Sequence, residues 1–135
     1  MQLWKILTVF AALSLITSQG SAAITGVKET GNIRYVSGGV GEAARNEFER
    51  AAEAFDVKLE LATASGAYLA STNVWVFGPG GQQLLATTTS GPLLLLDLPA
   101  GSYRIEAEHD GRRQGARVTV AEGEKVKPLT LSWAQ

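Results

Sequence analysis

The sequence contains no cysteine and a single histidine, and its acidic and basic side chains nearly balance. Without cysteine the chain forms neither disulfides nor thiolate metal sites, so its stability must come from apolar burial. With His109 as the sole histidine, a zinc centre has little to build from, and no serine lies in the G-x-S-x-G setting of a catalytic nucleophile. The formal net charge of −1 gives no electrostatic reason to expect nucleic acid as a partner.

The N-terminus has the order of a secretory signal peptide. Lys5 precedes the apolar run Ile6–Ile16, and the small, polar segment Thr17–Ala23 follows. An uncleaved membrane anchor would need about 20 apolar residues, whereas this run has eleven positions. We therefore expect cleavage after Ala23, with Ala22 as the alternative, and a periplasmic or secreted protein with no membrane span once the signal is removed.

Removal of residues 1–23 leaves 112 of the 135 residues, enough for one domain. Since only Lys5 among the charged residues leaves with the signal, 11 basic and 13 acidic side chains remain, for a net charge of −2. We expect an N-terminal extension over 24–37, in which Ile33–Val36 resembles a strand, a helical segment over 38–56 and a β domain over 57–135.

Apolar residues recur at helical spacing after a glycine-rich stretch, which predicts a helix over about 41–55. They form one stripe: Ala44, Phe48, Ala51, Ala52 and Phe55. The preceding Ser37–Glu42 (SGGVGE) invites comparison with phosphate-binding loops, but the G-x-x-x-x-G-K-[ST] spacing is absent. We interpret these glycines as a permissive start for the helix.

From Val57 onward the period changes to two, and seven short strands separated by turn residues predict a mainly β fold. This pattern favours a seven-stranded antiparallel β-sandwich over parallel strands linked by helices. The expected strands are 57–61, 73–77, 84–88, 93–96, 102–109, 112–121 and 126–133.

Two of these strands are apolar at every position, which predicts burial on both faces: Val74–Phe77 and Leu93–Leu96. A two-sheet sandwich leaves its outer faces exposed, so something must cover such strands. We expect the helix, through Phe48 and Phe55, to lie across the outer face of one sheet that contains both.

Asp110-Gly111 lies between two alternating runs, a strong signal for a two-residue hairpin turn. Closing the hairpin there pairs positions whose numbers sum to 221. One face is then apolar and the other is solvated, with Arg104, Glu106, Glu108, Arg113 and Arg117.

Three acidic residues surround the histidine in this hairpin: Glu106, Glu108 and Asp110. Glu108 and His109 are neighbours on a strand and point to opposite faces, which excludes joint ligation. Arg113 lies opposite Glu108 and disfavours proton sharing between Glu106 and Glu108. We predict no catalytic, metal-binding or cofactor-binding residues and no cofactor, and we expect no enzyme; a small hydrolase remains a third hypothesis for function.

Two tryptophans are open to two interpretations, packing within the protein or recognition of a ligand. Trp75 and Trp133 lie in predicted strands beside apolar residues, which favours core or sheet-edge packing. An exposed tryptophan would instead supply a stacking platform for sugars. The exposure of the two rings decides between these interpretations.

Leu98–Gly111 (LPAGSYRIEAEHDG) resembles the bacterial carboxypeptidase regulatory-like domains through the motif L-P-x-G-x-Y-x-[IV]-x-A. The resemblance covers roughly Val57–Trp133. It implies a prealbumin-like, or transthyretin-like, β-sandwich with an Ig-like arrangement. It also implies a non-catalytic accessory role, and related sandwiches bind starch.

Together these patterns predict a non-catalytic exported binding or adaptor domain for an envelope protein partner. The alternative is a carbohydrate-binding module that uses an exposed tryptophan. Neither nucleic acid nor a lipid bilayer is expected as a partner, and no individual ligand-binding or partner-binding residue is predicted.

Overall fold

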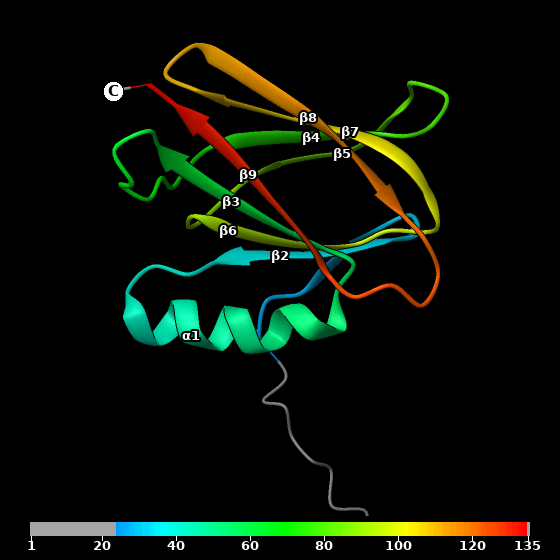
Figure 1. The fold of residues 1–135 in the computed structure, drawn as a ribbon, viewed down its shortest axis with the longest axis horizontal. Helices are drawn as coiled ribbons and strands as arrows, with labels where there is room; N and C mark the ends of the chain where they lie inside the picture. Colours follow the sequence, from blue (N-terminus) through cyan, green and yellow to red (C-terminus); the bar gives the residue numbers. More distant parts are fainter. Residues whose placement is uncertain (1–23, 135) are drawn as a thin grey trace, which may run out of the picture.

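The computed structural model describes residues 24–134, so the predicted signal peptide lies outside the described residues. The fold is mainly β, with one helix and two sheets that lie in layers (Figure 1). In chain order the elements are β1 (Lys28–Thr30), β2 (Ile33–Gly38), α1 (Glu42–Ala51), the 3-10 turn η1 (Ala52–Ala54), β3 (Val57–Thr63), β4 (Asn73–Phe77), β5 (Gln83–Thr88), β6 (Leu93–Asp97), β7 (Gly101–His109), β8 (Arg112–Val120) and β9 (Lys127–Trp133).

One sheet has the order β1-β2-β6-β3-β9 and the other has the order β5-β4-β7-β8. All seven predicted strands are present within a residue or two, but the described residues contain nine strands. Both additional strands come from the N-terminal segment: β2 confirms the strand-like character of Ile33–Val36 and pairs with β6 over Arg34–Gly38, and β1 pairs with β2. The expectation of an entirely antiparallel arrangement is wrong, because β3 and β9 run parallel.

The predicted hairpin register is confirmed. Strands β7 and β8 pair from Gly101↔Val120 to His109↔Arg112, with every pair summing to 221. Asp110 and Gly111 both have positive φ, 51° and 74°, as a two-residue type I′ turn requires.

Inward-facing residues of both sheets form one buried cluster. Leu59 and Leu94 come from the five-stranded sheet, and Val76, Ile105 and Ala107 come from the four-stranded sheet; all are 0% exposed. The chain crosses between the sheets from β6 to β7 through Leu98–Ala100, and the Tyr103 hydroxyl donates a hydrogen bond of 2.5 Å back to the Pro99 carbonyl. This bond, together with the bend, accounts for the L-P-x-G-x-Y spacing at the crossing.

The α-helix is shorter than the predicted 41–55: it spans Glu42–Ala51, a 3-10 turn follows over Ala52–Ala54, and Phe55 is already extended. The helix covers the outer face of the five-stranded sheet. Phe48 retains 7% exposure and packs with Phe55, Val36, Leu93 and Leu95 in a second buried cluster. The expected docking against Leu93–Leu96 is therefore confirmed, and a Lys58–Glu49 ion pair of 2.6 Å joins β3 to the helix.

The expectation that Val74–Phe77 shares this sheet is wrong. Strand β4 lies in the other sheet and alternates: Val74 and Val76 are buried in the core, whereas Trp75 and Phe77 are half-buried on the outer face. The sequence does not show this alternation, because the residues on the partly exposed face, Trp75 and Phe77, are aromatic and count as apolar in the pattern.

Close approach of the helix depends on a glycine in β2. A Cβ atom placed on Gly38 would lie 2.6 Å from Cζ of Phe48. Gly38, in the glycine-rich stretch before the helix, is therefore needed for helix packing. No helix within residues 24–134 is long and apolar enough to cross a membrane.

Replacement of Gly38 by alanine is expected to lower the free energy of unfolding by about 1–3 kcal/mol, because the methyl group overlaps the Phe48 ring in a packed cluster. Urea denaturation measures the change. Gly80→Ala is the matched control, since its Cβ would meet only the flexible end of Gln82. Equal stability of Gly38→Ala and the unaltered protein would contradict this account of helix docking.

Candidate functional site

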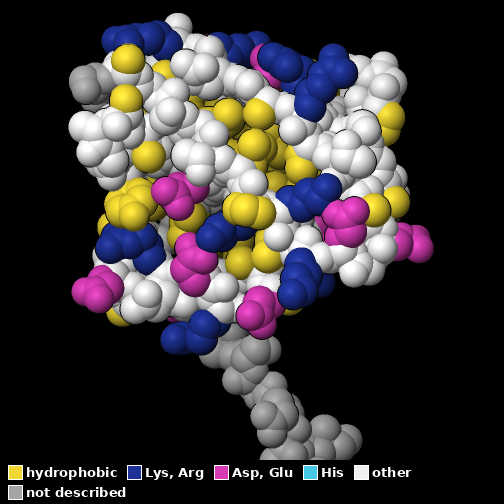
Figure 2. Space-filling view, viewed as in Figure 1, with side chains coloured by type: hydrophobic (Ala, Val, Ile, Leu, Met, Phe, Trp, Pro, Cys, Tyr) yellow, Lys and Arg dark blue, Asp and Glu magenta, His cyan; other side chains and the backbone are white. Residues whose placement is uncertain are grey.

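The outer face of the four-stranded sheet combines aromatic and charged side chains. We call this surface of β4, β7 and β8 the arginine face; it carries Trp75, Phe77, Arg104, Glu106, Glu108, Arg113 and Arg117. In the space-filling view Lys and Arg side chains gather along the rim above the four-stranded sheet, whereas most acidic side chains lie nearer the helix (Figure 2). Three arginines against two glutamates make this face positive on a chain whose net charge is −1.

Trp75 is the half-buried aromatic centre of the arginine face. The guanidinium carbon of Arg113 lies 4.1 Å from the centre of the Trp75 ring, a close cation–π contact. Trp75 pairs with Glu106 across β4 and β7, and Arg113 reaches it from β8. The exposed side of the tryptophan is therefore occupied by a cation.

Glu106 is held between two arginines. Its carboxylate accepts a hydrogen bond of 2.9 Å from Nε of Arg104 and one of 3.3 Å from Nη1 of Arg113. Glu108 lies 3.8 Å from Arg113, the residue opposite it in the ladder. These contacts confirm that the charged side chains share one face, and they direct the guanidinium groups of Arg104 and Arg113 toward Glu106.

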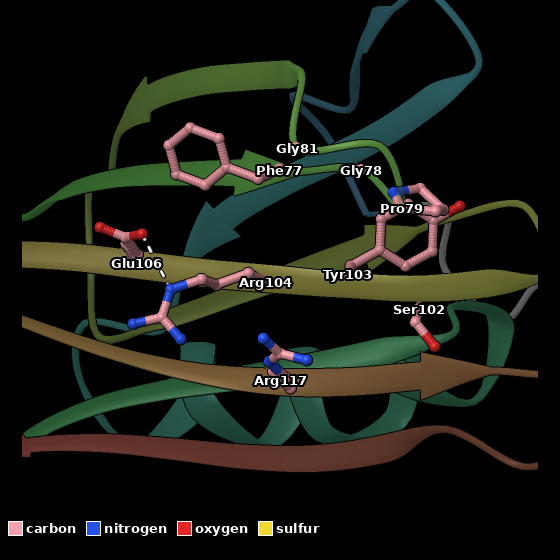
Figure 3. Close-up of a pocket in the computed structure, with 9 residues that line it drawn as sticks. All are labelled: Phe77, Gly78, Pro79, Gly81, Ser102, Tyr103, Arg104, Glu106 and Arg117. Carbon is pink, nitrogen blue, oxygen red and sulfur yellow. Dashed lines mark hydrogen bonds and ion pairs between the residues drawn. The ribbon is translucent and has the colours of Figure 1, made fainter.

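Beside these ion pairs lies a pocket of about 400 Å³. Its lining includes Phe77 and the turn residues Gly78, Pro79 and Gly81, together with Ser102, Tyr103, Arg104, Arg117 and the carboxylate-bearing Glu106 (Figure 3). Arg104 and Arg117 are directly opposed across β7 and β8. The pocket thus presents apolar and cationic surfaces to one ligand-sized volume.

Trp133 takes no part in this face. It is 1% exposed, and its indole Nε1 donates a hydrogen bond of 2.8 Å to the Arg112 carbonyl. His109 packs edge-on against it, with ring centres 5.9 Å apart, and Nη1 of Arg112 donates to the Ala134 carbonyl at 3.0 Å. The hairpin tip therefore ties the end of β9 to the other sheet.

The acidic residues around the histidine do not converge. Glu108 belongs to the arginine face, whereas His109 contacts Trp133 and lies 3.4 Å from Asp110. Within residues 24–134 no three histidine, cysteine or carboxylate side chains form a group that could hold a metal ion. In the glycine-rich stretch before α1, Gly41 is the N-cap residue of the helix, and no side chain caps the helix start.

Sequence reasoning missed a carboxyl pair, Asp56 and Asp97, which the fold brings together from the helix exit and the end of β6. A hydrogen bond that the protonated Asp97 carboxyl donates to Asp56, partial burial and the charge of Asp56 raise the pKa of Asp97 from 3.8 to about 6, against the opposing effect of Arg34. Asp56 also accepts a hydrogen bond of 2.9 Å from the Leu98 amide. Burial and the charge of Asp56 raise the pKa of Tyr103 as well. Asp56 thus holds the start of the crossing between the sheets through the Leu98 amide, and no local sequence signal joins it to the distant Asp97.

The carboxyl pair predicts that the folded protein is more stable at pH 5 than at pH 7. Because the folded chain binds more protons than the unfolded chain between 3.8 and about 6, the free energy of unfolding falls as pH rises through that range and is constant above it. We expect a difference of about 1 kcal/mol, since solvent screens a partly exposed group. Asp97→Asn should remove most of this pH dependence, whereas Glu53→Gln on the helix should leave it; thermal unfolding at both pH values measures it. An unchanged pH dependence in Asp97→Asn would refute the assignment.

Comparison with known proteins adds no family to these observations. No protein-family model matches the chain, and no curated protein is similar to it. The functional conclusion therefore rests on the residues and geometry of the arginine face.

Proposed function

We propose that this chain is a non-catalytic, exported binding domain that recognises an envelope protein partner through its arginine face. In this proposal the two sheets form a prealbumin-like β-sandwich similar to the carboxypeptidase regulatory-like domains. The shared core and the Tyr103 hydrogen bond at the sheet crossing support that assignment. The small-residue segment before Ile24 supports export to the periplasm or beyond.

The observation that carries the proposal is the stacking of Arg113 on Trp75 within a face of fixed strands. Tryptophan and arginine are the residue types that contribute most to protein–protein affinity. Here they are placed by β4, β7 and β8, which send Val74, Val76, Ile105, Ala107 and Val118 into the core. A rigid face loses little conformational entropy when a partner binds.

The same contacts argue against catalysis on this face. A carboxylate acting as a general acid or base needs freedom to exchange a proton with its substrate. Glu106 instead accepts hydrogen bonds from Arg104 and Arg113, so both of its carboxylate oxygens are engaged within the protein. Binding is the role that these side chains serve best.

Site-specific crosslinking tests the proposal. A photoreactive benzoylphenylalanine in place of Ala86, which is exposed and pairs with Trp75 across β4 and β5, borders the arginine face. In bacterial cells that export the full chain, irradiation should give an adduct of one defined mass. The same replacement at the exposed Asn46 on α1 should give none.

Charge reversal supplies the matched control for this experiment. Arg113→Glu should abolish the Ala86 adduct, because it removes the cation from Trp75 and opposes Glu106. Arg50→Glu makes the same change on the exposed surface of α1 and should leave the adduct. Equal adducts from Ala86 and Asn46, or loss with Arg50→Glu alone, would overturn the proposal.

The alternative function is a carbohydrate-binding module, and the half-buried position of Trp75 favours it. Trp133 is excluded as its platform, since that ring is 1% exposed. Sugars stack on an open aromatic face, but Arg113 already covers Trp75. The alternative therefore requires the guanidinium to leave the ring.

Tryptophan fluorescence distinguishes the two functions. Trp75 and Trp133 are the only tryptophans after residue 4, and Trp133 is shielded, so changes in emission of the processed chain report on Trp75. We expect neutral soluble glycans to leave the emission unchanged, because the cation blocks stacking. Saturable quenching by a glycan that is lost in Trp75→Phe would establish the carbohydrate-binding alternative instead.

A further inference from the structure

The pocket on the arginine face contains an unbalanced pair of cations. Arg104 and Arg117 lie directly opposite each other in the β7–β8 ladder, where like charges destabilise a sheet. Arg104 is neutralised by Glu106 at 2.9 Å. No ion pair joins Arg117 to any acidic side chain within residues 24–134.

A glycine in β8 determines how the Arg104 side chain lies next to this pair. Residue 115, which faces Glu106, is glycine, and a Cβ there would lie 2.7 Å from Nη2 of Arg104. The absent side chain lets the Arg104 guanidinium lie across β8. Arg104 lines the pocket together with Arg117 and Ser102 (Figure 3).

The opposite wall is apolar. Phe77 and Pro79 face the cations across the pocket, and the turn that carries Pro79 is closed by backbone hydrogen bonds between Gly78 and Gln82 and between Gly81 and Gly78. A ligand that fills the volume of about 400 Å³ would set a negative group against arginine and an apolar group against Phe77. Arginine suits a carboxylate because its planar donors match the two oxygens.

We propose that this pocket is a carboxylate-binding subsite, and that it takes an acidic group of a polypeptide partner beside an apolar side chain. The inference rests on the proposed binding function of the arginine face and names the chemistry of its partner. A C-terminal carboxylate and a glutamate or aspartate side chain present the same group. Arg117 supplies the uncompensated charge, and Arg104, already oriented by Glu106, supplies further donors.

Small probes test the subsite directly on the exported chain by NMR. N-acetyl-leucine carries a main-chain carboxylate and N-acetyl-glutamate α-amide carries a side-chain carboxylate; their matched controls are N-acetyl-leucinamide and N-acetyl-glutamine amide. Both acids should shift the amide signals of Gly78 and Gly81 and the Nε–H signal of Arg117, and the neutral amides should not. The tighter of the two acids identifies the source of the carboxylate.

Variants locate the binding energy. Arg117→Gln should weaken binding of the acids at least about 10-fold, the loss expected for one charge-assisted hydrogen bond. Arg117→Lys, which keeps the charge but not the paired donors, should bind with intermediate affinity. Arg50→Gln removes the same charge from the exposed surface of α1 and should leave the affinity unchanged.

Three results would overturn the inference: equal shifts from acids and amides, an equal loss in Arg50→Gln, or tighter binding of glucuronate than of either amino-acid probe. The last result would assign the pocket to acidic glycans. If no carboxylate binds but the Ala86 crosslink persists, the subsite is wrong while the partner-binding function stands. If both fail, the binding function itself is wrong.

Discussion

The structure depends on the burial of one strand from both sides. Leu94 and Leu96 of β6 enter the core shared by the two sheets, while Leu93 and Leu95 enter the cluster beneath the helix. Burial of a leucine side chain contributes about 1.5–3 kcal/mol, so the four together are comparable with the whole net stability of a small domain. A chain without disulfides needs such a strand at the centre of its sheet, and β6 lies between β2 and β3.

This constraint explains the parts that surround β6. The helix packs over Leu93 and Leu95, and the lack of a side chain at Gly38 lets Phe48 of the helix contact them. The N-terminal extension is drawn into the sheet because β6 needs a partner on its second edge, which β2 supplies. The hydrogen bonds from the Leu98 amide to Asp56 and from Tyr103 to Pro99 then hold the crossing that leaves β6 for the other sheet.

Local patterns in the sequence are enough to predict the helix, its apolar stripe and the register of the β7–β8 hairpin. In each case the partners are near in the chain, and the turn chemistry of Asp110-Gly111 sets the pairing. Patterns fail where pairing is distant: the parallel contact of β3 with β9, the recruitment of β1 and β2, and the union of Asp56 with Asp97. They also fail for Val74–Phe77, because a run of apolar letters does not reveal that Trp75 is covered by arginine rather than by a helix.

The candidate site is partly predictable from the sequence, because part of it comes from strands that are neighbours in the chain. The hairpin register alone places five charged side chains on one face: Arg104, Glu106, Glu108, Arg113 and Arg117. The contribution of β4 depends on a long-range ladder, so local patterns reveal neither the stacking of Arg113 on Trp75 nor the pocket beside Phe77.

The division of β7 into two faces connects fold and function. Tyr103, Ile105 and Ala107 lock the strand into the core, and this locking fixes where the arginines on its other side stand. Glu106 balances Arg104, and Glu108 lies beside Arg113. The remaining charge of the face therefore resides on Arg117, at the edge of a pocket that is large enough for a ligand group.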